Sequence, residues 1–263
     1  MTKTAIQSKT KPHDADKEYA ARLVTYWTGT VALAAFLFWM VFSPAGYGKL
    51  LRFLVPGSSV VTYPGAPLSQ LMGEHILIVT IASSIALVIG VGLGLLVLSR
   101  IGRPFRDVLV ALANLVQAIP TVAVIMLAVP LTGYGMEPVI IGLVLYSILP
   151  IMLNVIVGIE DVSPAARDAA RGIGMSATQR LVSVELPLAF PVILGSIKNM
   201  LVINISAATV GAVAAAGGLG QIILAGFSTY NTAFIVQGAL PVGVLALLVD
   251  RLLTQPQPKF LKN

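Results

Sequence analysis

The sequence predicts an all-α integral membrane protein with about six transmembrane helices. Two observations lead to this fold class. Hydrophobic residues make up 57% of the 263 positions and charged residues only 11%, against about 45–50% and about 25% in an average soluble domain. The apolar residues also form long runs, and about 20 of them in a helix cross a hydrocarbon core about 30 Å thick. Lipid is therefore the expected solvent for most of this chain.

Six apolar runs are long enough to be interpreted as transmembrane helices. The third and fourth runs are separated only by residues 132–137, whose glycines predict a tight helical hairpin. The proline-rich stretch between the first two runs predicts an extracytoplasmic loop with a short surface helix near residues 48–54. Glycine-rich residues 214–230 predict a re-entrant or outer-face element. The predicted spans are residues 23–42, 75–98, 108–131, 138–159, 187–212 and 233–252.

The distribution of basic residues predicts the orientation of the spans. Of the 17 Lys and Arg residues, 14 fall on one side, Lys49 and Arg52 fall on the other, and Lys198 lies inside the fifth run. By the positive-inside rule, both termini face the cytoplasm. This gives cytoplasmic tails at residues 1–22 and 254–263 around a transmembrane domain at residues 23–253. The polar N-terminus predicts a retained signal anchor instead of a cleaved signal.

Lys198 is an unusual residue for the interior of a span. A charged side chain at the bilayer centre costs about 2.5–3.5 kcal/mol on insertion scales. We expect Lys198 to lie near the cytoplasmic edge or to face a water-filled pathway, and a snorkelling interfacial lysine is the alternative.

The loop at residues 160–187, between the fourth and fifth spans, has clear helix signals. Ser163 before Pro164 predicts the start of a short helix over residues 164–171. Gly172 and Gly174 can adopt the positive φ that ends a helix, and Ser176 with Gln179 forms a capping box for a second short helix, which Pro187 should stop. The small side chains of Ala165, Ala169 and Ala170 would let a partner approach closely, as a helix fits a groove.

This loop resembles the EAA loop of the permeases of ABC importers, whose pattern is E-A-A-x3-G-x9-I-x-L-P. Residues 168–170 (Asp-Ala-Ala), Gly174 and residues 184–187 (Val-Glu-Leu-Pro) agree with it at every spacing. Asp168 replaces the usual glutamate and Val184 the usual isoleucine, and both keep the chemical type. The shorter carboxylate of Asp168 leaves the detail of its contacts open.

The resemblance implies a type I importer transmembrane domain in a bacterial inner membrane. In that family the loop forms coupling helices that dock into a separate ATPase subunit, which binds ATP and Mg²⁺. The implied partners are two cytoplasmic ATPase subunits, a second permease copy or a related permease, and an extracytoplasmic solute-binding protein. The expected coupling residues are Asp168, Ala169, Ala170, Gly172 and Gly174.

Other function classes are less compatible with the sequence. There is no Walker A pattern, so ATP must be bound by another subunit, and we expect no cofactor, metal site, catalytic residue or nucleic-acid partner in this chain. An ion-coupled secondary transporter stays open as an alternative, although the acidic residues map to loops and span ends instead of span interiors. A purely structural loop and a plain channel also stay open.

Further motifs resemble the permeases of osmoprotectant importers, which carry glycine betaine, choline or carnitine. They include residues 117–120 (Gln-Ala-Ile-Pro), 145–150 (Leu-Tyr-Ser-Ile-Leu-Pro) and 237–240 (Gln-Gly-Ala-Leu). The resemblance implies a quaternary amine as solute, and another small solute such as an amino acid is the alternative. Polar residues inside the spans are the candidates for the translocation path, although the serine and threonine could instead serve helix packing. These candidates are Gln117, Asn154, Asn199, Asn204, Ser206 and Thr209.

Overall fold

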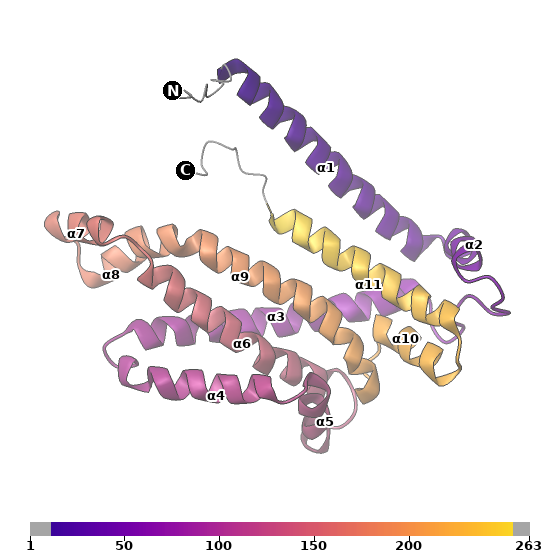
Figure 1. Ribbon diagram of the computed structural model, residues 1–263. Coiled ribbons are helices and arrows are strands. Elements are labelled where there is room, and N and C mark those ends of the chain that lie inside the picture. Colours follow the sequence, from indigo (N-terminus) through magenta and orange to yellow (C-terminus); the bar gives the residue numbers. More distant parts are fainter. Residues whose placement is uncertain (1–11, 255–263) are drawn as a thin grey trace, which may run out of the picture.

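The computed structural model describes the backbone of residues 12–254 and the side chains of residues 19–254 except that of Ala113. The described part is built from helices and their connections (Figure 1). Residues 1–11 and 255–263 of the predicted tails lie outside the described residues, and the first helix begins within the predicted N-terminal tail. The helices are α1 (Pro12–Phe42), α2 (Pro44–Leu54), α3 (Leu68–Leu98), α4 (Arg106–Ala118), α5 (Thr121–Thr132), α6 (Met136–Glu160), α7 (Pro164–Gly172), α8 (Ala177–Arg180), α9 (Leu186–Ala207), α10 (Leu219–Ser228) and α11 (Thr232–Leu253).

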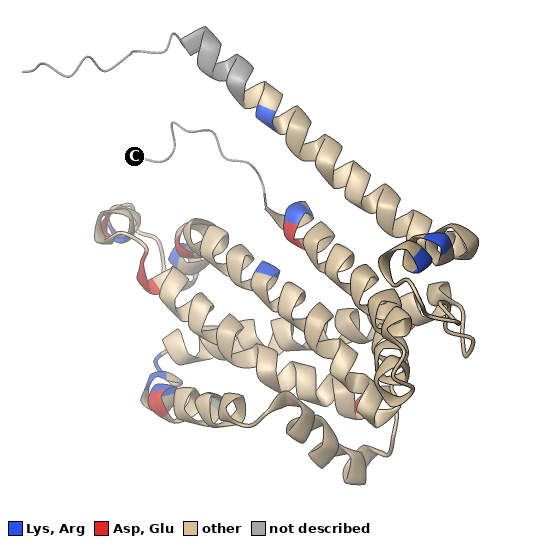
Figure 2. Cartoon of the chain, turned by 45° about the vertical axis from the view of Figure 1, so that its right-hand side comes forward, with Lys and Arg blue, Asp and Glu red and all other residues tan. Residues whose placement is uncertain are grey.

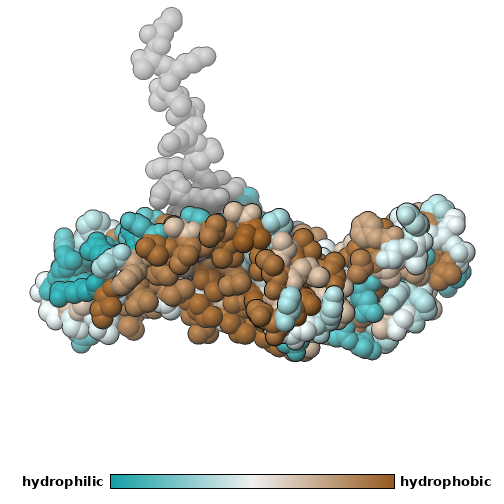
Figure 3. Space-filling model, turned by 90° about the horizontal axis from the view of Figure 1, so that it is seen from below, coloured by the Kyte–Doolittle hydropathy of each residue, from teal (hydrophilic) through white to brown (hydrophobic). Residues whose placement is uncertain are grey.

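Five helical segments in the described part are long and apolar enough to cross a membrane, and α4 with α5 would make a sixth span. The all-α membrane fold predicted from the sequence is therefore confirmed. Figure 3 shows a hydrophobic surface in the middle of the molecule and hydrophilic surfaces toward both ends. Large apolar side chains such as Val88, Leu112 and Leu127 are exposed, as expected where lipid is the solvent.

The predicted third span, residues 108–131, consists of two helices with a bend between them. The chain bends by 97° between α4 and α5. Ile119 has an extended backbone (φ −86°, ψ 131°), the conformation favoured directly before a proline, and Pro120 lacks the N–H needed to continue the helix. At about 1.5 Å per residue, neither α4 nor α5 alone is long enough to cross the bilayer.

Small residues allow the central helices to pack closely. A Cβ on Gly90 would lie 2.8 Å from the side chain of Ile151, and a Cβ on Gly94 would lie 2.8 Å from that of Val155. Both glycines are on α3 and both partners are on α6. Glycine on a helix face lets two backbones approach within the membrane, where packing drives association.

The fifth span differs from the prediction at both ends. Pro187 does not stop the preceding helix, because a π turn at Leu181–Glu185 joins α8 to α9 in one helical segment, Ala177–Ala214. The wider π turn accommodates the proline ring and its missing N–H without breaking the helix. At the other end the chain tightens into a 3₁₀ helix, Ala208–Ala214, before α10.

The region between α9 and α11 is held by the N-terminal part of α3. Gly217 and Gly218 have positive φ, and the carboxylate of Glu74 accepts a hydrogen bond from the Gly218 amide at 2.9 Å. Next to this region, the buried His75 ring contacts the Ile205 carbonyl of α9 at 2.9 Å through Nε2. Irregular backbone is thus held by contacts within the protein here, and the re-entrant or outer-face placement of this element stays a prediction.

Figure 2 shows the described Lys and Arg residues concentrated at one end of the bundle, near α7, α8, the start of α4 and the end of α11. Lys49 and Arg52 lie on α2 at the opposite end. Lys198 reaches the first of these ends, where its ammonium lies 3.2 Å from the Asp250 carboxylate and 3.1 Å from the Thr254 hydroxyl. Lys198 therefore belongs to the charged end of the bundle.

Candidate functional site

Helix α7 projects from the charged end of the bundle, and both of its ends are capped as the sequence predicts (Figure 1). At its start the Ser163 hydroxyl accepts a hydrogen bond from the Ala166 amide at 3.3 Å. At its end the Met175 amide donates to the Ala170 carbonyl at 3.1 Å and the Gly174 amide donates to the Arg171 carbonyl at 3.0 Å. This pair of bonds is the Schellman motif, and Gly174 supplies its left-handed residue with φ +80°.

Helix α8 begins with the predicted capping box. The Ser176 hydroxyl accepts from the Gln179 amide at 3.3 Å, and the Gln179 side chain accepts from the Ser176 amide at 2.9 Å. The helix is only four residues long before the π turn begins. The second short helix of the prediction is thus the first turn of the segment that enters the membrane as α9.

The expected coupling residues do not all lie at the surface. Asp168, Ala169, Gly172 and Gly174 are exposed, but Ala170 is 4% exposed because it faces the base of the loop. Gly172 is helical and is not needed for a positive φ, which only Gly174 adopts. Asp168 pairs with Arg171 at 3.2 Å in an exposed contact of small energetic value.

Ile173 is part of the same exposed surface, although sequence reasoning missed it. It is 76% exposed at the end of α7. An isolated large apolar residue between two glycines of a polar loop was the available signal. We define the coupling surface as Asp168, Ala169, Gly172, Ile173 and Gly174.

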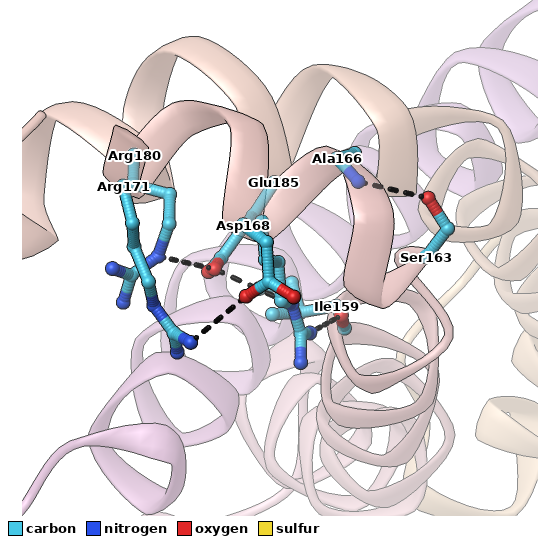
Figure 4. Close-up of polar contacts among 8 residues, drawn as sticks. Ile159, Ser163, Ala166, Asp168, Arg171, Arg180 and Glu185 are labelled. Carbon is cyan, nitrogen blue, oxygen red and sulfur yellow. Dashed lines mark hydrogen bonds and ion pairs between the residues drawn. The ribbon is translucent and has the colours of Figure 1, made fainter. Parts of the chain in front are cut away.

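A charged cluster lies at the base of the loop (Figure 4). One carboxylate oxygen of Glu185 lies 2.9 Å from the Arg180 Nε and 3.5 Å from the Arg167 Nε. Arg167 also donates a hydrogen bond to the Ile159 carbonyl, in the last turn of α6. Glu185 is 8% exposed, so this carboxylate has little contact with solvent. Sequence reasoning treated these arginines only as orientation signals and Glu185 only as a motif position.

A cleft of about 350 Å³ lies between α4, α6 and α9, and it brings together four of the six candidate path residues. Ser206 and Thr209 do not line it. Their hydroxyls donate to carbonyls of their own helical segment, those of Val202 and Ser206, which supports the packing alternative. The lining residues are Gln117, Tyr146, Ser147, Pro150, Asn154, Ser196, Asn199, Met200, Ile203 and Asn204.

A proline explains part of the polar lining of the cleft. Pro150 lies inside α6 and has no N–H to donate to the Tyr146 carbonyl, four residues earlier. The Gln117 side chain of α4 donates to that carbonyl at 3.3 Å. Asn154 donates to the Pro150 carbonyl at 2.7 Å, and the Ser196 hydroxyl of α9 donates to it at 3.3 Å. The polar side chains thus serve the backbone as well as the cleft.

Asn204 joins three helices at the buried side of the cleft. Its carbonyl oxygen accepts from the Ser147 hydroxyl of α6 at 3.0 Å, and its amide donates to the Ser83 hydroxyl of α3 at 3.0 Å. Asn204 is 1% exposed and both serines are buried. The residue therefore acts first as a structural link, although one side of it lines the cleft.

The described residues contain no group of three or more His, Asp or Glu side chains arranged to hold a metal ion. The cleft lining contains no ionisable acid or base other than the Tyr146 phenol.

Comparison with solved structures identifies the architecture. The chain is similar to a permease structure described as inward facing MetNI methionine ABC transporter, with a TM-score of 0.60, 24% identity and coverage of 70% of this chain and 94% of that one. It is also similar to an amino acid ABC transporter crystallised with histidines, with a TM-score of 0.58, 19% identity and coverage of 81% and 95%. At this level of identity the likeness shows the fold, which is that of type I ABC importer permeases.

Sequence comparison identifies the family. Residues 86–262 match the family described as binding-protein-dependent transport system inner membrane component. The osmoprotectant import permease protein OsmW of Salmonella typhimurium is 37% identical over 195 residues, which cover 72% of this chain and 90% of that protein. The glycine betaine/carnitine/choline transport system permease protein OpuCB of Bacillus subtilis is 34% identical over 195 residues, covering 74% and 89%. The chain belongs to the inner-membrane permease family of binding-protein-dependent ABC transporters.

Proposed function

We propose that this chain forms the translocation path of an importer for a quaternary-amine osmoprotectant such as glycine betaine, choline or carnitine. The observation that supports this solute class is the set of relatives at 34–37% identity, whose names include these compounds or osmoprotectants in general. A binding protein outside the membrane would deliver the solute. Methionine and other amino acids are the alternative solutes, suggested by structural neighbours of lower identity.

In this proposal the coupling surface of α7 docks into a separate ATPase subunit, which holds ATP and Mg²⁺. Support comes from the position of α7 at the charged end of a membrane bundle and from the exposure of Asp168, Ala169 and Ile173. A short helix with small side chains and one apolar residue suits insertion into a groove of a partner protein. Because positive charge collects on the cytoplasmic side, this end and both termini are assigned to the cytoplasm.

The cleft between α4, α6 and α9 is the proposed part of the path in this chain. Gln117 and Asn199 are exposed at positions within membrane helices, where polar groups are expected to face protein or a water-filled cavity. A second permease copy or a related permease, packed over the cleft, would close this cavity. Such a wall without carboxylates or ammonium groups could admit a zwitterion or a cation without a strong ion pair that delays its release.

The test is coupled uptake by the reconstituted complex of permease, ATPase and binding protein. Asp168→Lys should abolish uptake and weaken retention of the ATPase, while membrane insertion continues. Asp107→Lys is the matched control, because Asp107 is an exposed carboxylate at the same end of the bundle but lies on α4. Normal coupled uptake by Asp168→Lys would refute the docking role, and uptake driven by an ion gradient without ATP would identify a secondary transporter instead.

The solute class requires a separate measurement. Uptake of labelled glycine betaine, choline, carnitine and methionine should be compared in proteoliposomes that contain the complete complex. Uptake of the amines and not of methionine is expected. Preferred uptake of methionine would refute the osmoprotectant assignment while leaving the role of α7 intact.

A further inference from the structure

The loop that carries the coupling surface connects to its two membrane helices through short turns. From α6 it departs through a turn at residues 161–163. After α7 the chain turns again at residues 173–176, and from Ala177 it continues without interruption through α8 and the π turn at Leu181–Glu185 into α9. A displacement applied to this side of the loop can therefore be carried by a helical segment.

The π turn positions the charged cluster at the root of α9. Its defining bond runs from the Leu186 amide to the Leu181 carbonyl, five residues earlier. In a regular α-helix, side chains five residues apart point about 140° away from each other. In the π turn, Arg180 and Glu185 meet at 2.9 Å although they are five residues apart. The π turn therefore allows this ion pair, which a regular α-helix would not allow at this spacing.

Arg167 brings α7 into this cluster. Its Nε lies 3.5 Å from the Glu185 carboxylate, an ion-pair distance without a hydrogen bond, and its guanidinium also donates to the Ile159 carbonyl of α6. The side chains of Arg167 and Glu185 are 28% and 11% exposed, whereas those of the Arg106 and Glu160 pair at the same end of the bundle are 43% and 42% exposed. Removing one partner from a buried charge cluster is far more disruptive than removing one from an exposed pair.

The helix that begins at this cluster also supplies half of the cleft. Five of the ten lining residues lie on α9, and they are Ser196, Asn199, Met200, Ile203 and Asn204. At about 1.5 Å per residue, Asn199 lies about 21 Å along the helix from Glu185. A shift of the root of α9 therefore moves one wall of the cleft directly.

We propose that Glu185, hydrogen-bonded to Arg180 and ion-paired with Arg167, is the joint that connects the coupling helix α7 to α9 and transmits its displacement to the cleft. This inference rests on the proposed docking of α7 to an ATPase. Glu185 and Arg167 are positioning residues in this mechanism, because they lie beneath the coupling surface and outside the cleft. Without the joint, α7 would still bind its partner, but its movement would be lost in the loop.

The proposal is tested with the complete complex in proteoliposomes, by measuring solute taken up per ATP hydrolysed. Glu185→Gln keeps the size of the side chain and removes its charge, whereas Arg167→Gln removes the contact of α7 and leaves Arg180 beside Glu185. Each variant should retain the ATPase and its basal hydrolysis, and should lower uptake per ATP about tenfold, within the range of typical coupling energies. Arg167→Lys should recover part of the loss because it keeps a positive charge. Asp107→Asn removes an exposed carboxylate at the same end of the bundle and should leave the ratio unchanged.

A distance measurement separates a mechanical joint from a general loss of stability. The chain contains no cysteine, so spin labels attached before assembly at Ala166→Cys on α7 and Leu188→Cys on α9 report the α7–α9 distance with no other labelled site in this chain. Ala166 is partly exposed and Leu188 is exposed. The distance should be the same with and without ATP in the native cluster, and it should vary with ATP in Glu185→Gln.

The outcomes distinguish this inference from the proposed function. If the ATPase docks on α7 but Glu185→Gln and Arg167→Gln both keep native uptake per ATP, the joint is refuted and the docking role stands. If Glu185→Gln fails to assemble, Arg167→Gln alone decides the question. If Asp168→Lys does not affect docking or uptake, the proposed docking role of α7 is refuted, and the joint that rests on it is refuted as well.

Discussion

Replacing Gly174 tests whether the end of α7 must be formed before its partner can bind. Gly174 has φ +80° and donates its amide to the Arg171 carbonyl in the Schellman motif. An L-residue in the left-handed conformation costs about 1–2 kcal/mol. Helix α7 has only nine residues, and helices below about 12–15 residues are marginal without tertiary support. The cost should therefore reduce the population of the ordered helix end.

If the ATPase binds only ordered α7, the apparent affinity falls with that population. A loss of about 1–2 kcal/mol corresponds to at most about 5–30-fold weaker docking of Gly174→Ala. Gly174→Asn should lie between alanine and the native residue, because asparagine tolerates the left-handed region better. Gly172→Ala should instead strengthen docking of the ATPase. Gly172 is helical, so alanine favours the ordered helix, and an added Cβ meets nothing within 4 Å.

The assay is a titration of the solubilised permease with purified ATPase subunit, followed by fluorescence of a single introduced cysteine. The expected order of affinity is Gly172→Ala, native, Gly174→Asn and Gly174→Ala, from tightest to weakest. Equal affinities for the two alanine variants would refute the argument from backbone conformation.

Three further perturbations test the bundle. Asn204→Leu leaves two buried serine hydroxyls without their partner, so it should destabilise the permease by about 1–3 kcal/mol; an unchanged melting temperature in detergent would contradict the link between three helices. Gly94→Leu should cost about 1–3 kcal/mol by overpacking against α6, whereas Gly92→Leu on the same helix meets open space; equal melting temperatures would argue against the close approach of α3 and α6. Lys198→Met removes a partly exposed pair with Asp250 and should cost less than about 1 kcal/mol, an effect that shrinks at high salt; a large effect independent of salt would place Lys198 in the bundle interior.

The sequence was sufficient to predict most spans, because segments that lie in lipid must be apolar along most of their length. It could not determine the angle of the bend at Pro120. A proline inside an apolar run can kink a helix slightly or end it, and the choice depends on which neighbours satisfy the released backbone groups. Here the extended Ile119 turns the chain by 97°. The same limit applies to Pro187, where a π turn lets the helix continue.

The coupling loop was predictable where the interactions are local. The Ser163 cap, the positive φ of Gly174 and the capping box of Ser176 all involve residues within five positions of each other. The contact of Arg167 with Glu185 spans 18 positions and requires the loop to fold back on itself. No periodicity in the sequence indicates such a contact, and for this reason the charged cluster was missed.

The cleft also explains why polarity alone selected too many path residues. Asn199 and Asn204 line it, whereas Ser206, two residues beyond Asn204 and on the same helix, bonds to its own backbone. The position of each residue along α9 relative to the cleft decides between them. That position depends on the tertiary structure and cannot be read from the polarity of the sequence.

Several polar side chains of the cleft are already engaged by the protein. Gln117 serves the Tyr146 carbonyl, Asn154 serves the Pro150 carbonyl and Asn204 binds two serines. A solute that enters would therefore meet uncharged groups with only part of their hydrogen-bonding capacity unused. Transport requires sites that are weak enough to release the solute, and such a lining meets that requirement. Strong selection is then expected on the separate binding protein, where tight binding does not obstruct passage through the membrane.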